Sequence, residues 1–590
     1  MSQKEIRSCP TTDMWTYSSG EIANSLISNT IFGFAMLYYT DALGLSPALA
    51  GIAMSLAIFW DAITDPLMGH ISDNTKSRFG RRHQYMLFGG VAMVLSFFFI
   101  WAVPSVFKQS STRLFWYLVV INMVMRTAYT IFIVPVTALG FEMCKDYTGR
   151  TKMQGTKAIF NMIANFLGPG LAWTFFFPKQ GVDVKDPANY LEMGTVFSIV
   201  SLLSVFFVVF ITRKYAVDSR EMKTTGSSPS AFFKDMFEIV SDPRAVCVFA
   251  FAVVVILGVG LVAGLQMYVY EHFMHLDGIQ KTITHGGSMV GMMTGAVFCS
   301  RFAKRLDKKK TVYVGGAITL ASGAMLTALF VPEIIKPEQI LSMGGFSFPV
   351  AVAFFAFFGA TYWFGNGVML PVATSMMADI SEINELKTGI NKDGSYSAMY
   401  SLSMKISQSL SALIVGFVLA AVGFVTLGDV VGNEDYAVGF MEGNEMTYGS
   451  NAVLGVVGGT AVVESIESDW GFVKGTGTTI QVEDALLGFM PSAGVVRSND
   501  AVQGYLTATD MVPGDHAIAA SLDATDVPRG DGPVAGYVKG ASVTQSHDTV
   551  MRLFIATYII GPVISITALI LIWLYPVNRT FLEELRAAAA

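Results

Sequence analysis

Charged residues are scarce in this 590-residue sequence, where they make up 14% of the chain, against about 25% in soluble domains. Hydrophobic residues reach 52% and aromatic residues 12%, and the mean hydropathy is +0.51. A chain of this length with so few charges cannot cover a surface that faces water. The composition therefore excludes a string of soluble domains and indicates one membrane protein with many spanning helices.

Cysteine is also scarce, and the four residues have no metal-binding spacing: Cys9, Cys144, Cys247 and Cys299. This excludes a disulfide framework and a zinc site. The sequence shows no pairing of a nucleophile with a base, so we expect neither an enzyme nor a bound cofactor. Residues 1–15 lack the regions of a signal peptide, so we expect the first apolar helix to be retained.

Acidic residues are concentrated in one segment, 426–550, which holds 17 acidic and 4 basic residues, whereas the rest of the chain holds 28 and 35. An acidic block beside a basic membrane body excludes a nucleic-acid binder. The Gly, Val and Thr content of the block predicts short strands with many turns, hence a small β-rich domain. The alternative is that the acidic block is a poorly ordered segment attached to the membrane body.

Apolar runs of about 20 residues, the length that spans a bilayer, predict an all-α polytopic membrane protein with twelve helices. The expected spans are 18–40, 47–70, 84–104, 114–138, 155–177, 191–212, 246–272, 284–302, 313–332, 348–378, 396–424 and 551–575. The expected parts are a six-helix half (1–212), a cytoplasmic central loop (213–245), helices seven to eleven (246–425), the acidic insertion (426–550), and helix twelve with a tail (551–590).

Lysine and arginine gather in alternate connections, and the positive-inside rule places those connections in the cytoplasm. These groups are Lys76, Arg78, Arg81 and Arg82; Lys145, Arg150 and Lys152; Arg213, Lys214, Arg220, Lys223, Lys234 and Arg244; and Arg301, Lys304, Arg305, Lys308, Lys309 and Lys310. We therefore expect both termini to be cytoplasmic, the insertion to be extracytoplasmic, and the protein to lie in a bacterial inner membrane.

The second apolar run carries two carboxylates. Asp61 and Asp65 are four residues apart in IFWDAITDPLMGHISD, which puts both on one helical face. An ionised residue within a span costs about 2.5–3.5 kcal/mol, and two neighbouring carboxylates also repel each other. A bound cation between them is the simplest resolution. The alternative is a structural salt bridge, with Arg126 of the fourth helix as partner.

Further oxygen ligands lie in the first helix. Counted from the outer ends of the helices, Glu21 lies level with Asp65. Asn24 lies one turn further than Glu21 into the membrane. We therefore expect a cation site formed by Asp61, Asp65, Glu21 and Asn24. An oxygen-rich set suits a hard cation such as Na⁺, whereas a lone carboxylate would suit H⁺.

Aromatic and amide residues in other spans suit a sugar. TYWFGNG places Trp363 near Asn366, and Asn161 lies in the fifth helix. Aromatic faces stack on sugar rings while amides bind hydroxyl groups, although such residues also occur in ordinary helix packing. Lys405 of the eleventh helix adds a charge, and its alternative role is to snorkel to the cytoplasmic interface.

Six segments resemble the glycoside–pentoside–hexuronide:cation symporters of the major facilitator superfamily, and the melibiose carriers in particular. The longest is WDAITDPLMGHISDNTKSRFGRRHQYML at 60–87, and the others are 38–46, 134–153, 375–389, 400–417 and 573–585. The resemblance covers nearly the whole membrane body and leaves out the acidic insertion. It implies a major facilitator fold of two six-helix halves, with the substrate bound between them.

The resemblance also implies roles for single residues. Asp61 and Asp65 match the two aspartates that bind the coupling cation in melibiose carriers. Lys405 matches the lysine of the eleventh helix in that branch, and Lys157 matches a position that is commonly basic in the family.

In three places the sequence departs from the melibiose carriers. A sugar-binding aspartate falls on Ser25, an aspartate of the fourth helix on Ile133, and an arginine before the first aspartate on Ile58. These departures argue against melibiose-like recognition.

We therefore expect a secondary active transporter that couples Na⁺ or H⁺ to the symport of a sugar, glycoside or uronide by alternating access. The residues expected to bind this small molecule are Arg126, Lys157, Asn161, Trp363, Asn366 and Lys405. We expect a monomer surrounded by membrane lipid. Two alternatives are a lysophospholipid transporter with the same fold, and a membrane sensor or assembly protein that uses the extracytoplasmic domain.

Overall fold

The computed structural model describes the helical body of the chain and separate strands of the insertion. The described residues are 10–75, 77, 82–108, 110–143, 147–178, 183–215, 238–336, 339–343, 346–388, 393–424, 426, 436–440, 453–457, 460–464, 470–473, 478–481, 542–545, 547–577, 581 and 584–585.

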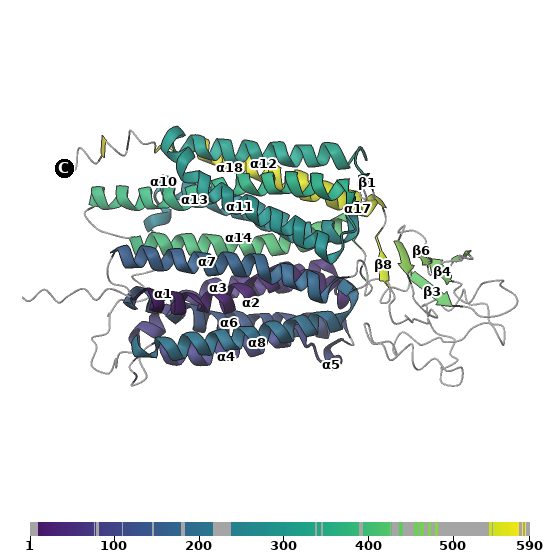
Figure 1. Cartoon of the computed structure of the whole chain (residues 1–590), viewed down its shortest axis with the longest axis horizontal. Coiled ribbons are helices and arrows are strands. Elements are labelled where there is room, and N and C mark those ends of the chain that lie inside the picture. The colour runs from purple at the N-terminus through teal and green to yellow at the C-terminus, as the bar shows by residue number, and fades with distance from the viewer. Residues whose placement is uncertain are drawn as a thin grey trace, which may run out of the picture.

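The N-terminal half consists of helices joined by short connections (Figure 1). They are α1 (Thr11–Ser18), α2 (Gly20–Leu37), α3 (Pro47–Asn74), α4 (His83–Trp101), α5 (Ser105–Lys108), α6 (Ser111–Met143), α7 (Tyr147–Leu171) and α8 (Pro187–Thr212). Two π-helical segments, η1 (Tyr38–Ala42) and η2 (Ala172–Phe176), continue α2 and α7, and two short 3₁₀ turns flank α8, η3 (Asp183–Lys185) and η4 (Arg213–Tyr215). The first predicted span is therefore interrupted, because α1 ends one residue before α2 begins.

The C-terminal half has the same kind of architecture. Its helices are α10 (Pro243–Tyr268), α11 (Gly278–Leu306), α12 (Lys308–Phe330), α13 (Val350–Thr388), α14 (Asp393–Val422), α17 (His547–Ile555) and α18 (Gly561–Leu574). Here too π-helical segments interrupt or continue helices, namely η5 (Val269–Phe273) after α10 and η7 (Ala556–Ile560) between α17 and α18. An antiparallel hairpin of β1 (Ile340–Met343) and β2 (Phe346–Pro349) joins α12 to α13.

Six strands are described within the acidic insertion. They are β3 (Tyr436–Phe440), β4 (Val453–Val457), β5 (Thr460–Glu464), β6 (Trp470–Val473), β7 (Thr478–Gln481) and β8 (Ser542–Thr544). All pairings are antiparallel, in two three-stranded sheets with the orders β3-β4-β5 and β6-β7-β8. The β-rich character of the whole insertion stays a prediction, because most of 426–550 lies outside the described residues.

Nine helices in the described part of the chain are long and apolar enough to cross a membrane. The protein is therefore a multi-pass membrane protein. The count of twelve spans stays a prediction, because the helices at three predicted positions are less apolar or shorter. Polar residues lower the hydropathy of α2 and α11, and α18 has 14 residues.

Helix starts follow a local rule in both halves. Asp186 and Asp242 each precede a proline and accept a hydrogen bond from a backbone N–H two residues later, at 2.8 and 2.9 Å. An aspartate cap followed by proline at the first helical position satisfies or removes the free N–H groups of the first turn. These caps fix where α8 and α10 begin.

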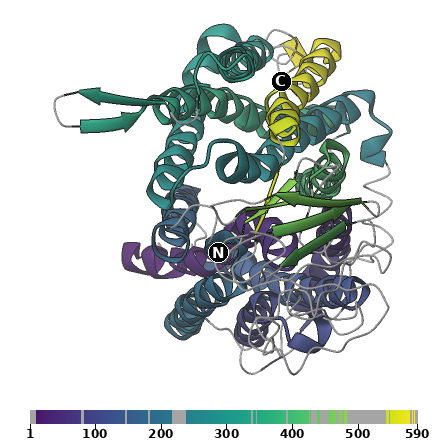
Figure 2. The same cartoon turned by 90° about the vertical axis from the view of Figure 1, so that its right-hand side faces the viewer.

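The helices run along one common direction and form two groups, with the N-terminal half below the C-terminal half in Figure 1. Strands β3, β4, β6 and β8 lie beyond one end of the helices, hereafter the insertion end (Figure 1). Figure 2 looks onto this end and shows the β1–β2 hairpin projecting sideways from the helices. The division into the five predicted parts remains a prediction.

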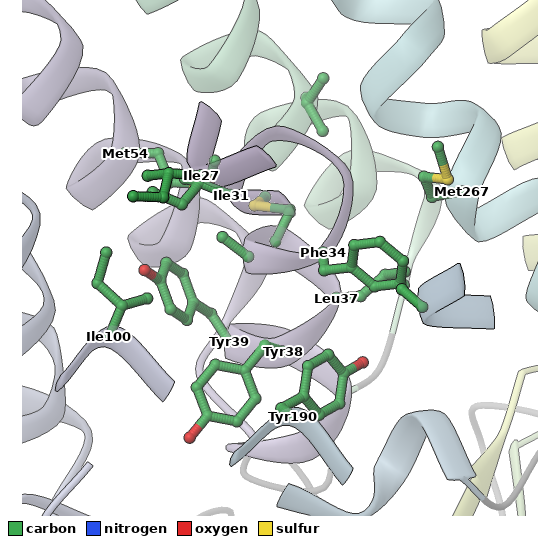
Figure 3. Packing of buried hydrophobic residues seen from close by; sticks show 14 of the residues in the cluster. Ile27, Ile31, Phe34, Leu37, Tyr38, Tyr39, Met54, Ile100, Tyr190 and Met267 are labelled. Atoms are coloured by element: carbon green, nitrogen blue, oxygen red, sulfur yellow. The ribbon is translucent and has the colours of Figure 1, made fainter. Parts of the chain in front are cut away.

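A buried aromatic group fills the N-terminal half near the insertion end (Figure 3). The ring centroids of Tyr38 and Tyr190 are 4.7 Å apart, and the Tyr190 ring stacks on Trp101 at 5.9 Å. The hydroxyl of Tyr38 donates to the backbone oxygen of Trp101 at 2.7 Å. The same hydrophobic core includes Met267 of α10, so it is continuous across the two halves.

The helices α3 and α14 form the most extensive contact between the halves. A Cβ atom added to Gly416 would lie 2.4 Å from the backbone oxygen of Pro47, and one added to Gly51 would lie 2.9 Å from that of Ala412. One turn along α3 from Gly51, the hydroxyl groups of Ser55 and Ser409 are 2.9 Å apart. Small residues permit such approach between membrane helices, where dispersion contacts and hydrogen bonds hold helices together.

This contact leads to the first prediction. Gly416→Ala should lower the free energy of unfolding by about 1–3 kcal/mol, because the added methyl group overpacks a backbone contact. The thermal unfolding midpoint of the purified protein in detergent measures the effect. Gly33→Ala is the matched control, since a Cβ there meets nothing within 4 Å. Equal midpoints for the two variants would show that α3 and α14 do not touch in this way.

Candidate functional site

An ion-paired cluster joins α3 and α14 at the boundary between the halves. Lys405 Nζ lies 3.0 Å from Asp61 Oδ2 and also forms an ion pair with Asp65 Oδ2. The same ammonium donates to the backbone oxygen of Asp61 at 3.2 Å. The side chain of Asp61 is 3% exposed, and that of Asp65 is 26% exposed. The two aspartates share one face of α3, as the spacing predicts. The Lys405 side chain thus contacts this aspartate pair and does not extend toward the membrane interface.

The helix α6 completes the surroundings of the aspartate pair. Thr130 Oγ1 lies 2.7 Å from Asp61 Oδ1 and 2.8 Å from Asp65 Oδ1, and its one hydroxyl proton can be donated to only one of them at a time. Arg126 Nη1 is 3.9 Å from Asp61 Oδ2. Sequence reasoning named Arg126 but missed Thr130, although the four-residue spacing that puts both on one face of α6 was available as a signal.

The predicted cation ligand Glu21 belongs to a second ion pair. Lys157 Nζ of α7 lies 2.8 Å from Glu21 Oε1, and Asn24 donates to Glu21 Oε2 at 2.8 Å. Tyr129 of α6 donates to Asn24 Oδ1 at 2.6 Å. Glu21 and Asn24 therefore interact with α6 and α7 rather than completing one ligand set with the aspartate pair. Depth along a helix, on which the prediction rested, does not fix the direction of a side chain.

Amide groups link α2 to α7 beside this second pair. Asn161 Nδ2 donates to Ser25 Oγ at 2.8 Å, and Asn165 Nδ2 donates to Asn161 Oδ1 at 3.0 Å. Asn29 contacts Asn165 and donates to the backbone oxygen of Ser25 at 2.6 Å. Asn161 and Asn165 are both partly exposed. This chain of amides offers the donors and acceptors that hydroxyl groups need.

The predicted sugar-binding residues of α13 are buried within their own half. Trp363 Nε1 donates to Gln266 Oε1 of α10 at 3.1 Å, and Asn366 donates to the backbone oxygen of Tyr362 at 3.1 Å. Trp363 is 4% exposed and Asn366 is 2% exposed. Their described hydrogen bonds hold α13 in place and do not reach the aspartate pair.

The chemistry of the aspartate pair suits a monovalent cation. Two carboxylates and the Thr130 hydroxyl offer hard oxygen ligands, which alkali cations prefer. In the described arrangement the ammonium of Lys405 lies between the carboxylates and neutralises part of their charge. A side chain of α14 thus takes the position that a free cation would need.

A sequence model of the MFS/sugar transport protein family matches residues 16–441, a range that contains both ion-paired clusters. The chain belongs to this family. Its members are transporters rather than enzymes, and the resemblance to glycoside–pentoside–hexuronide:cation symporters is confirmed by the relatives that follow.

Two curated relatives match most of this MFS protein. The glucuronide carrier protein homolog of Escherichia coli (strain K12) is 21% identical over 415 residues, which cover 69% of this chain and 83% of that protein. The isoprimeverose transporter of Lactiplantibacillus pentosus is 21% identical over 427 residues, which cover 70% of this chain and 81% of that protein.

Among solved structures, the nucleoside transporter NupG aligns with a TM-score of 0.49 at 11% identity and covers 71% of this chain and 94% of its own. A D-xylose-proton symporter aligns with a TM-score of 0.46 at 14% identity and covers 69% of this chain and 88% of its own.

The geometry predicts that Lys405 stabilises the folded protein by its charge. Lys405→Ala should lower the free energy of unfolding by about 3–5 kcal/mol, because it leaves the two carboxylates of α3 short of a partner. Lys405→Arg keeps the charge and should lose clearly less. Thermal unfolding in detergent at neutral pH, without added sodium, measures both.

The control for this prediction is Lys336→Ala. Lys336 also pairs with a carboxylate, that of Glu333, but the two side chains are 64% and 45% exposed, so its loss should cost at most about 1 kcal/mol. Equal destabilisation by Lys405→Ala and Lys405→Arg would contradict the prediction, since it would implicate side-chain shape rather than charge.

Proposed function

We propose that this protein is a secondary active transporter that couples the entry of Na⁺ or H⁺ to the symport of a sugar, glycoside or uronide. The observation that carries the proposal is the Asp61–Asp65–Lys405 cluster, in which the acids belong to one half and the base to the other. The names of the two curated relatives, a glucuronide carrier homolog and an isoprimeverose transporter, support a sugar-like substrate.

In this proposal the coupling cation and Lys405 compete for the aspartate pair. Asp61 and Asp65 would hold the cation, with Thr130 as a further oxygen ligand. Because like charges cannot share so small a site, cation binding requires Lys405 Nζ to move away from the carboxylates. Lys405 is part of α14, so its release changes the contact between α3 and α14.

This competition would link ion binding to the arrangement of the two halves. An ion that binds one arrangement of the halves better than the other shifts the equilibrium between them, and the effect on substrate affinity must be reciprocal. Alternating access would follow from movement of one half against the other around a central substrate site, as in transporters built from repeated halves. The amides of Asn161 and Asn165 and the second ion pair would line that site.

The orientation in the membrane forms part of the same proposal. The basic connections between helices support a cytoplasmic position for the helix ends opposite the insertion. Both termini would then be cytoplasmic, and the insertion end would face outward. We propose the bacterial inner membrane as the location.

The charge balance of the centre favours an anionic sugar. The two clusters together contain three carboxylates and three bases: Glu21, Asp61, Asp65, Arg126, Lys157 and Lys405. A cation bound in addition leaves one uncompensated positive charge inside the membrane, which is costly. A substrate with one carboxylate or sulfonate group would restore neutrality, whereas a neutral sugar would not.

The main test replaces each carboxylate of the pair by its amide. Asp61→Asn and Asp65→Asn should each abolish ion-driven accumulation while exchange of labelled substrate across the membrane continues, because the sugar contacts lie elsewhere. Asp242→Asn is the control, since asparagine also caps helices. Uphill uptake, exchange and membrane abundance are measured together. Normal ion-coupled accumulation in both variants would sink the proposed mechanism, and loss of membrane abundance alone would indicate a structural salt bridge instead.

A second test addresses the charge of the substrate. In proteoliposomes with an inward sodium or proton gradient, hexuronates should accumulate more strongly than neutral hexoses or pentosides. Their uptake should also be insensitive to a potassium–valinomycin potential, because one cation and one anion move together. Accumulation restricted to neutral sugars, and driven by an inside-negative potential, would contradict the charge-balance argument.

A further inference from the structure

A second group of charged residues lies at the insertion end, on the boundary between the halves. It consists of Asp41, Lys185, Glu271, His272 and Lys281, hereafter the insertion-end cluster. Asp41 belongs to η1, Lys185 to η3, Glu271 and His272 to η5, and Lys281 to the first turn of α11.

One contact between a histidine and a carboxylate of the insertion-end cluster crosses between the halves. His272 Nε2 lies 2.8 Å from Asp41 Oδ2, and the two side chains are 7% and 2% exposed. The other oxygen of Asp41 accepts a hydrogen bond from Thr40 Oγ1 at 2.8 Å, and Thr40 Oγ1 lies 2.7 Å from the hydroxyl of Tyr268 in α10. Two neighbouring residues of the N-terminal half thus contact the C-terminal half, Asp41 through His272 and Thr40 through Tyr268.

An ion pair is fully buried beside this contact. Glu271 and Lys281 form an ion pair within the C-terminal half, with side chains 1% and 0% exposed. Lys281 Nζ also lies 4.5 Å from the ring centroid of Trp173, which belongs to η2 of the N-terminal half. An ammonium over an indole face is attracted by the ring, most strongly where water is excluded. Lys281 therefore also joins the halves.

The charges of the insertion-end cluster compensate one another. Two carboxylates stand against two lysines, and His272 contacts one of the carboxylates. Burial lowers the pKa of the Lys185 ammonium, and the negative charges of Asp41 and Glu271 oppose that shift. Tyr38 of the buried group in Figure 3 belongs to η1, the same segment as Asp41, and its ring packs against that of Tyr190.

We propose that the insertion-end cluster is the outer gate of this transporter, and that the Asp41–His272 contact is the latch that closes it. This inference rests on the proposed alternating-access function. Three π-helical segments, η1, η2 and η5, contribute to the gate, and such segments occur frequently at functional sites. The latch would open when the halves separate at the insertion end and would reform when they close.

Ion pairs suit a gate that must open repeatedly. Desolvation nearly cancels the attraction between buried charges, so that exposing such a pair to water changes the free energy little. An apolar interface would instead resist opening in proportion to the apolar area that it exposes to water. A charged interface therefore closes the substrate path without holding the protein permanently closed.

The proposal can be tested with a thiol reporter behind the latch. Ser409 is 7% exposed, contacts Ser55 of α3, and lies one helical turn outward from Lys405. In right-side-out membrane vesicles that carry Ser409→Cys, a membrane-impermeant maleimide from outside can reach this position only when the insertion end opens. Peptide mass spectrometry reads the modification at position 409 separately from the native cysteines. The labelling rate then reports the population of the open state.

Asp41→Asn and His272→Asn, each introduced into the reporter protein, should raise this rate by roughly fivefold or more, the lower end of typical coupling between sites. The double variant should label no faster than the faster single variant, because the two residues act as one pair. Asp41→Glu keeps the charge and should label at a rate near that of the reporter protein. Asp186→Asn is the control, because Asp186 caps α8 at the same end and accepts its hydrogen bond within its own half.

Rates equal to that of the reporter protein in both Asp41→Asn and His272→Asn would overturn the proposal. A rate that rises as much in Asp41→Glu as in Asp41→Asn would also overturn it, since it would indicate local unfolding rather than loss of a latch. The labelling needs no sugar. A reporter protein that transports no sugar would contradict the proposed function, whereas the labelling rates would still decide whether the latch exists.

Discussion

An ionised side chain inside a membrane-spanning bundle needs a neighbour of opposite charge, and this requirement organises the interior of the protein. The carboxylates of α3 meet a lysine of α14, the carboxylate of α2 meets a lysine of α7, and the carboxylate of η1 meets a histidine of η5. Two of these three contacts join the N-terminal to the C-terminal half. The pairing that makes the charges tolerable therefore also sets how the two halves lie against each other.

The two contacts between the halves differ in what can replace them. At the centre, a free cation can take the place of the Lys405 ammonium, since both are small positive groups that need the same oxygen atoms. At the insertion end, separation of Asp41 from His272 would admit water, which solvates both groups. In the proposed cycle the first contact responds to an ion and the second to solvent. A transporter of this design would use one kind of interaction, the buried ion pair, for coupling and for gating.

The sequence predicted the part of the site that depends on one helix or on a resemblance. The spacing of Asp61 and Asp65 fixes their common face, because a helix has a constant pitch. Lys405 was predicted as a charge within an apolar span and again through the family resemblance, while its contact with both aspartates required the three-dimensional arrangement. The role of Glu21 as a cation ligand stays a prediction. The structure pairs Glu21 with Lys157 of α7, a contact that the sequence could not predict because rotation of a helix about its axis is set by packing against its neighbours. The insertion-end cluster was not predicted, since its residues come from four separate segments, and only Asp41 lies in a segment that resembles the family, 38–46.

The glycine contact between α3 and α14 gives these helices the properties of a lever. At Gly51 and Gly416 the two backbones touch, whereas Asp61 and Lys405 lie ten and eleven residues further along their helices, about 15–17 Å away at 1.5 Å per residue. A tilt of about 10° around the glycine contact would displace the far end of such an arm by roughly 3 Å at this helical rise. That displacement is similar to the 3.0 Å distance between Lys405 Nζ and Asp61 Oδ2. A rotation too small to disturb the packing at the glycine contact is therefore large enough to separate Lys405 from Asp61.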